Sequence, residues 1–136
     1  MSALPDPGTP ADWLRHARSD LALSRAAVEG VLYENLCFHA QQAAEKGVKA
    51  VLVAGGITFP RTHNLSVLLD RVPKSILVPP AVELATDLTQ YAVATRYPGV
   101  EEPVTPEEYA DAIRAAEAVV KWATDLVGAN PPSPAP

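Results

Sequence analysis

Four polar side chains recur at helical spacing near the middle of the chain. His39, Gln42, Lys46 and Lys49 follow one another at intervals of three, four and three residues, so on a single helix they share one flank. We call these four residues the ladder. Two ammonium groups, an amide and an imidazole suit a phosphate together with the edge of a base or a ribose. The alternative is an ordinary polar surface on which Glu45 and Lys49 form an i,i+4 pair.

A second polar stretch, residues 61–64, precedes a short predicted helix. Arg61 supplies a positive charge, and His63 lies where the free amides of a helix start favour an anion. The alternative is structural, with Asn64 capping the helix and His63 packed against its neighbours. Residues 61–64 are therefore a second candidate binding site.

Arg96 and Tyr97 form a third candidate, immediately before Pro98. The helix that precedes Pro98 must end there, so the Arg96 guanidinium complements the negative pole of that helix without any ligand. It could also reach a buried carboxylate such as Asp20, or stack on a base.

Prolines divide the chain into long stretches that contain none, and these stretches read as helices. The clearest start is Thr105, followed by Pro106 and by Glu108 three residues after the cap. A similar start lies at Thr9, and Gly55 can end the second helix. The pattern predicts helices over residues 10–29, 34–54, 64–71, 80–97 and 105–128.

Four long helices and one short helix, joined by short connections, predict an all-α fold. We expect an antiparallel four-helix up-and-down bundle with one extra short helix over residues 10–128, between a flexible segment 1–9 and a Pro-rich disordered tail 129–136. Alanine-rich inward stripes indicate close helix packing. The opposite, polar arc of helix 34–54, which includes Gln41 and Glu45, is expected to face outward. Phe38 and Trp122 are candidates for an interface, or else they cover a loop or the edge of the core.

Composition limits the functional classes that remain. The chain has 136 residues, a net charge of −5 and one cysteine. A general nucleic-acid binder would be basic, so only a local cationic patch is compatible with this charge. Without a secretory leader or a long apolar run, we expect a soluble cytoplasmic protein with no membrane contact. Cys37 falls on an apolar helix face, where packing is its expected role.

Three stretches also carry a resemblance to a known family. Residues 38–46 read Phe-His-Ala-Gln-Gln-Ala-Ala-Glu-Lys, residues 61–65 read Arg-Thr-His-Asn-Leu, and residues 95–98 read Thr-Arg-Tyr-Pro. In that order, and preceded by Trp13, Ala17 and Asp20-Leu21, they resemble the HEPN domain family of small all-helical prokaryotic proteins over residues 11–128. The resemblance implies a helical bundle that is commonly a homodimer. It also implies a role beside a minimal nucleotidyltransferase in two-gene toxin–antitoxin modules.

The resemblance does not extend to catalysis. Ribonuclease members of the HEPN class use an Arg followed, after four to six residues, by a His that transfers a proton at the dimer cleft. The three histidines here are His16, His39 and His63, and none follows an Arg at that spacing. The sequence also lacks a phosphate loop, a zinc motif and a nucleophile elbow. We therefore predict no catalytic residues, no metal and no cofactor.

Three functions remain open from the sequence. The leading hypothesis is a module that binds a nucleotide or RNA without nuclease activity. The first alternative is a structural module whose polar arc forms a homodimer or heterodimer surface. The second is a divergent metal-independent ribonuclease toxin, with His39 or His63 carrying the proton and Arg61 or Arg96 holding the phosphate.

Overall fold

The computed structural model describes residues 8–92 and 102–129, and it is helical throughout its regular structure. The helices are α1 (Pro10–Ser24), α2 (Tyr33–Ala54), α3 (Leu65–Leu69), α4 (Pro80–Glu83), the 3₁₀ helix η1 (Leu84–Tyr91) and α5 (Pro106–Ala129). No strand occurs in either described range. The all-α class is confirmed. The expectations for residues 1–7, for Arg96 and Tyr97, and for the tail beyond residue 129 lie outside the described residues.

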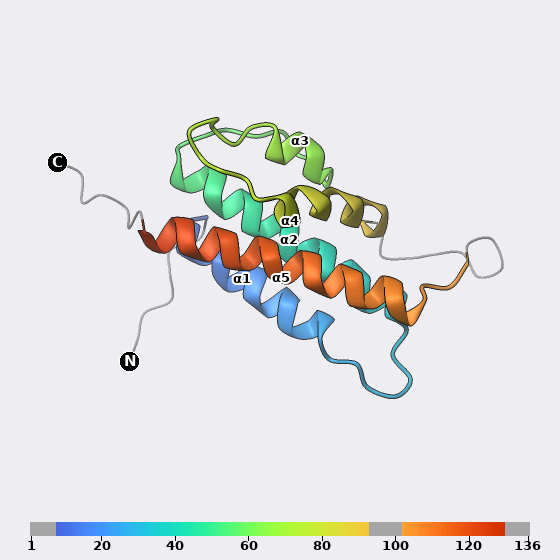
Figure 1. Ribbon diagram of the computed structural model, residues 1–136. Coiled ribbons are helices and arrows are strands. Elements are labelled where there is room, and N and C mark those ends of the chain that lie inside the picture. The colour runs from blue at the N-terminus through green and yellow to red at the C-terminus, as the bar shows by residue number, and fades with distance from the viewer. Residues whose placement is uncertain (1–7, 93–101, 130–136) are drawn as a thin grey trace, which may run out of the picture.

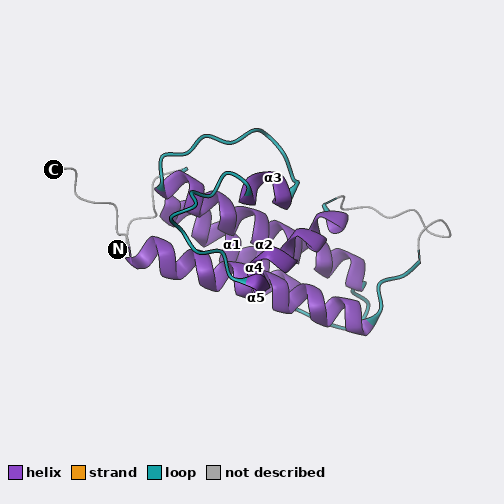
Figure 2. Ribbon diagram, turned by 45° about the horizontal axis from the view of Figure 1, so that its top comes forward, coloured by secondary structure: helices purple, strands orange, loops and turns teal. Residues whose placement is uncertain are grey.

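The three long helices run side by side, and α2 packs against both α1 and α5, which also contact each other (Figures 1 and 2). Helix α4 continues directly into η1, and together they run across α2 and α5 as the fourth member of the bundle. The short α3 lies over α2. Successive members alternate in direction, as the predicted up-and-down bundle requires. Within the described ranges, no helix is both long and apolar enough to cross a membrane.

The predicted helix starts at Thr9 and Thr105 are confirmed by their caps. The Thr9 hydroxyl accepts a hydrogen bond from the Asp12 amide at 3.1 Å, with Pro10 at the first helical position. The start of α5 is a capping box, in which the cap residue and the residue three positions later bond to each other. The Glu108 amide donates to Thr105 Oγ1 at 3.1 Å, and the Thr105 amide donates to Glu108 Oε1 at 2.9 Å.

Helix α1 ends at Ser24, about five residues earlier than predicted. The Ser24 hydroxyl donates to the Leu21 carbonyl at 2.6 Å, and the Arg25 amide bonds back to the same turn, so the last carbonyls are satisfied locally. The chain then turns at Gly30, whose φ of +89° favours glycine. In a helix over residues 10–29, Val28 would continue the inward stripe of Ala17 and Leu21, but in this connection it is 60% exposed.

The stretch after Pro80 is not the regular α-helix that we predicted. It forms one α turn and then eight residues of 3₁₀ helix, which has three residues per turn. Burial follows that period, because Val82, Ala85, Leu88 and Tyr91 are all buried. In the α-helix predicted over residues 80–97, Leu84 would share the side of Leu88, but it is 65% exposed.

Helix α2 is buried around most of its circumference. Ala40, Ala43 and Ala44 are fully buried, and a Cβ on Gly47 would meet Val119 Cγ1 of α5 at 3.2 Å. The predicted close packing of small residues is confirmed. The predicted outward polar arc is wrong for Gln41, which is fully buried, and for Glu45, because neighbouring segments cover that side.

Candidate functional site

A buried carboxylate on α2 is the centre of the first group of polar side chains. The Glu45 side chain is 4% exposed. Its Oε1 atom accepts hydrogen bonds from Gln41 Nε2 at 3.1 Å and from His63 Nδ1 at 2.8 Å, and its Oε2 atom accepts from Lys49 Nζ at 2.8 Å. We call these four residues the Glu45 cluster. Helix α2 contributes three of them at i,i+4 spacing, and the loop before α3 contributes His63.

The charge of Glu45 is maintained by its partners. Burial raises the pKa of the carboxyl, but hydrogen bonds from Lys49, His63 and Gln41 outweigh burial and hold that pKa below its ordinary value. Glu45 is therefore ionised at neutral pH. Among the described residues, no buried side-chain nitrogen or oxygen lacks a hydrogen-bond partner.

The ionised carboxylate decides the tautomer of His63. A carboxylate only accepts hydrogen bonds, so Nδ1 of the ring must carry a proton in this contact. In the neutral ring, Nε2 is then a proton acceptor. The His63 side chain is 67% exposed although its partner is buried. His63 is therefore a ring anchored on one side by Glu45, with much of its surface open to solvent.

Lys49 is held between the carboxylate and two aromatic rings. Its side chain is 12% exposed, and Nζ lies 5.5 Å from the ring centre of Trp13 and 5.7 Å from that of Phe59. The two rings meet edge to face with centroids 6.5 Å apart. Cation–π attraction adds to the ion pair with Glu45, so the ammonium is enclosed by its own protein.

The loop that carries Arg61 and His63 is pinned at two points. Gln41 Nε2 donates to the His63 carbonyl at 3.1 Å. The Asn64 side chain caps α3 by accepting from the Ser66 amide at 2.9 Å, as the structural alternative predicted. Arg61 is exposed and makes no hydrogen bond or ion pair with the residues that the structure describes. The loop thus offers an unpaired cation two residues from an oriented imidazole.

A second carboxylate organises the other half of the ladder. Asp20 of α1 accepts from Lys46 Nζ at 2.6 Å and contacts His39 Nδ1 at 3.0 Å. We call these three residues the Asp20 cluster. The side chains of His39 and Lys46 are 33% and 24% exposed, and that of Asp20 is 11% exposed. Each cluster therefore joins one carboxylate, one imidazole and one ammonium group.

The ladder is thus divided between two acidic residues that the sequence did not indicate as site residues. Gln42 lies beside them, and its Nε2 donates to Gln41 Oε1 at 2.7 Å. One feature of the sequence could have revealed such a residue: an acidic side chain beside the apolar stripe of a helix. Asp20 lies in this way beside Ala17 and Leu21. Because each lysine of the ladder is paired with a carboxylate, the charges within the two clusters cancel. Arg61, on the loop two residues before His63, is a cation that has no such partner among the described residues.

The two interface candidates occupy different environments. Trp122 is 8% exposed, and its Nε1 donates to the Leu77 carbonyl at 3.0 Å, so it covers the loop before α4 as the alternative predicted. Phe38 is half-buried and meets the His39 ring edge to face, with ring centroids 5.3 Å apart.

In the described ranges, no three His, Cys, Asp or Glu side chains gather where they could hold a metal ion.

Comparisons with known proteins agree with this fold. The sequence profile of the HEPN domain matches residues 10–126. A solved crystal structure of ST0689, an archaeal HEPN homologue, is similar with a TM-score of 0.61 and 30% identity, covering 89% of this chain and 97% of that one. The candidate toxin MJ1304 of Methanocaldococcus jannaschii is 37% identical over 54 residues, which are 40% of this chain and 35% of that protein. Since the profile covers most of the chain and the solved homologue covers nearly the whole bundle, this protein belongs to the HEPN domain family.

Proposed function

We propose that the protein binds RNA or a nucleotide at the loop of Arg61 and His63, and that it does so without cleaving RNA. The observation that carries the proposal is the Glu45–His63 contact, which holds an exposed imidazole in one orientation on the loop that also carries the exposed Arg61. A guanidinium recognises a phosphate by paired hydrogen bonds, and an imidazole can contact a ribose or base edge. Preorganised groups of this kind reduce the entropy lost on binding.

The biological setting follows from the family and from one relative. HEPN domains resemble components of two-gene toxin–antitoxin modules, and the relative from Methanocaldococcus jannaschii is named as a candidate toxin. We propose that this chain is one component of such a module and forms a homodimer. Its partner in the module is a minimal nucleotidyltransferase. Because the match spans about a third of that relative, its activity is carried over only as part of this proposal.

Filter binding with a labelled single-stranded RNA tests the proposal directly. Arg61→Ala and His63→Ala should both weaken binding, because both side chains are exposed. In His63→Ala the buried Glu45 keeps Lys49 and Gln41 as partners, and a circular-dichroism melt of that variant checks that the fold is retained. For Arg61→Ala, the salt dependence should also decrease by roughly 0.7 in the slope of log affinity against log salt, as for one phosphate contact. The matched control is Lys74→Ala, which removes an exposed cation on another loop. Equal affinities for all four proteins would discard the Arg61–His63 site.

Lys46→Ala and Lys49→Ala are less suitable as tests. Either change would leave a carboxylate of low exposure without its ammonium partner, so a loss of binding could reflect a loss of stability. A circular-dichroism melt of each variant must therefore accompany any binding measurement. Only weakened binding with an unchanged melting temperature would assign Lys46 or Lys49 to the ligand.

A structural interaction module is the second candidate function. The observation in its favour is that every lysine and histidine of the ladder already has an intramolecular partner. Size-exclusion chromatography with light scattering, followed by a thermal-shift screen with nucleotides, separates the two functions. Oligomerisation without any ligand response would favour the interaction module.

A further inference from the structure

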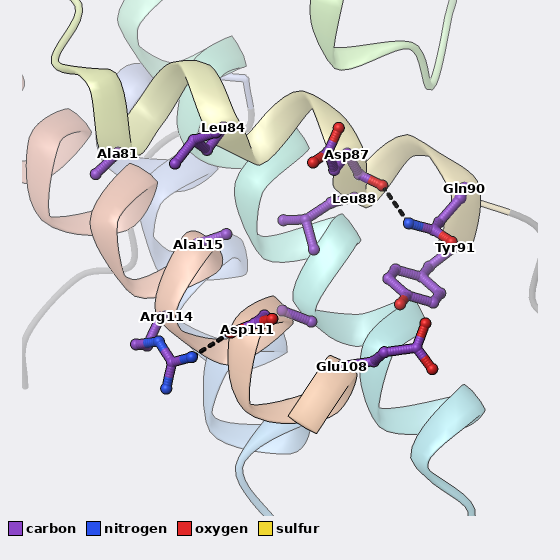
Figure 3. A pocket seen from close by; sticks show the side chains of 11 residues that line it. Ala81, Leu84, Asp87, Leu88, Gln90, Tyr91, Glu108, Asp111, Arg114 and Ala115 are labelled. Carbon is purple, nitrogen blue, oxygen red and sulfur yellow. Dashed lines mark hydrogen bonds and ion pairs between the residues drawn. The ribbon is translucent and has the colours of Figure 1, made fainter. Parts of the chain in front are cut away.

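A groove of about 630 Å³ lies between η1 and α5 (Figure 3). None of its lining residues belongs to the Glu45 or Asp20 cluster, so the clusters do not account for it. Its surface is mostly apolar, and Leu84 on one side is 65% exposed. An exposed apolar surface framed by polar residues is typical of an interaction site.

The first wall of the groove depends on the 3₁₀ form of η1. Leu84, Asp87 and Gln90 follow at intervals of three residues, and three residues make one turn of a 3₁₀ helix, so these side chains lie above one another in one straight row. In an α-helix, each interval of three would rotate the side chain by about 60° out of this row. The 3₁₀ helix therefore places Leu84, Asp87 and Gln90 in one row, which we call the Leu84 ridge.

The second wall and the floor come from α5 and from the buried side of η1. Glu108, Asp111 and Ala115 follow at spacings of three and four, so they share the face of α5 that lines the groove. Ala112 and Ala115 carry only methyl groups, which leaves room between the walls. In Figure 3, Leu88 lies between the two helices and Asp111 and Glu108 lie along the α5 side.

The rim of the groove is acidic. The lining includes three carboxylates, on Asp87, Glu108 and Asp111, and one guanidinium, that of Arg114, which is paired with Asp111. The Asp87 carboxylate has no hydrogen bond or ion pair within residues 8–92 and 102–129. A second copy of this chain carries a net charge of −5, so like charges disfavour it as the occupant.

We propose that this groove binds an amphipathic basic helix of a partner protein. Leucine-sized side chains at positions i, i+3 and i+7 of that helix enter between the Leu84 ridge and Ala115, and its Lys or Arg residues pair with Asp87 and Glu108 on the rim. Helix-in-groove recognition uses this spacing, and complementary charge determines which helices are accepted.

Fluorescence anisotropy with two synthetic peptides tests the proposal. One is a labelled Leu/Lys amphipathic helix, and the other is the same peptide with every Lys replaced by Glu. The full chain should bind the Lys peptide and not the Glu peptide. Leu84→Ser should weaken binding about tenfold by removing an apolar contact, and Asp87→Lys should weaken it about tenfold by reversing a rim charge.

The controls separate the groove from general attraction to an acidic protein. Leu77→Ser removes a leucine that is 82% exposed outside the groove, and Asp70→Lys reverses an exposed charge outside it. Both controls should leave the affinity unchanged. The proposal is overturned if Asp70→Lys weakens binding as much as Asp87→Lys, or if the wild type binds neither peptide. It is also overturned if the wild type self-associates and Leu84→Ser abolishes that association, because the occupant is then a second copy.

Discussion

The Nδ1 atom of His63 lies 2.8 Å from Oε1 of Glu45, which ties an exposed ring on a loop to a buried carboxylate on the central helix. The same carboxylate holds Lys49 and Gln41. The orientation of the imidazole, the position of the loop and the charge of the buried residue therefore depend on one another. Because His63 is exposed and Glu45 is not, changes at the two residues should have different effects.

Glu45→Gln should destabilise the fold by about 3–5 kcal/mol, because it leaves the Lys49 ammonium nearly buried without its counter-charge. Urea unfolding followed by circular dichroism measures this loss. The matched control is Glu117→Gln, which removes an exposed ion pair with Arg25 and should cost less than about 1 kcal/mol. Equal costs for the two variants would contradict the structural role of Glu45.

Stability should fall as the pH is lowered through the acidic range. The pKa of Glu45 is lower in the folded protein than its ordinary value of 4.5. Its contribution is therefore complete above that value and is lost as the pH falls toward the folded-state pKa. Urea titrations from pH 7 to pH 3 should show this decline in the wild type and a shallower one in Glu45→Gln. Parallel declines would show that the Glu45 carboxylate is not responsible.

Gly47→Leu should destabilise the bundle by about 1–3 kcal/mol or more, since even a Cβ there meets Val119 at 3.2 Å. The matched control is Gly128→Leu near the end of α5, where a Cβ would meet nothing within 4 Å. Thermal unfolding of both variants tests the close contact of α2 with α5. A similar melting temperature for the two variants would mean that this contact yields easily.

Incubation with RNA should give binding without cleavage. The Arg and His pair of the ribonuclease members is absent from the sequence, and the oriented His63 acts in our proposal as a ligand contact. Gel electrophoresis of a labelled RNA after incubation with wild type and His63→Ala checks this. Cleavage by the wild type that disappears in His63→Ala would instead make His63 a proton carrier, as in the divergent ribonuclease alternative.

Local sequence signals were sufficient for much of the fold. The caps at Thr9 and Thr105 and the proline boundaries act within one helical turn, so they can be read without knowing the neighbours. They failed for the stretch after Pro80, where spacing did not distinguish an α-helix from a 3₁₀ helix. The choice there depends on how Val82, Ala85 and Leu88 pack against α2 and α5.

The sequence by itself determined an all-helical chain, the order of its helices and the common flank of the ladder, because helix caps and periodicity are local properties. Only the tertiary structure decided what that flank faces. Packing α1 beside α2 placed Asp20 next to Lys46, and the loop before α3 brought His63 to Glu45. A carboxylate taken out of water must find partners, and these partners came from segments distant in the chain.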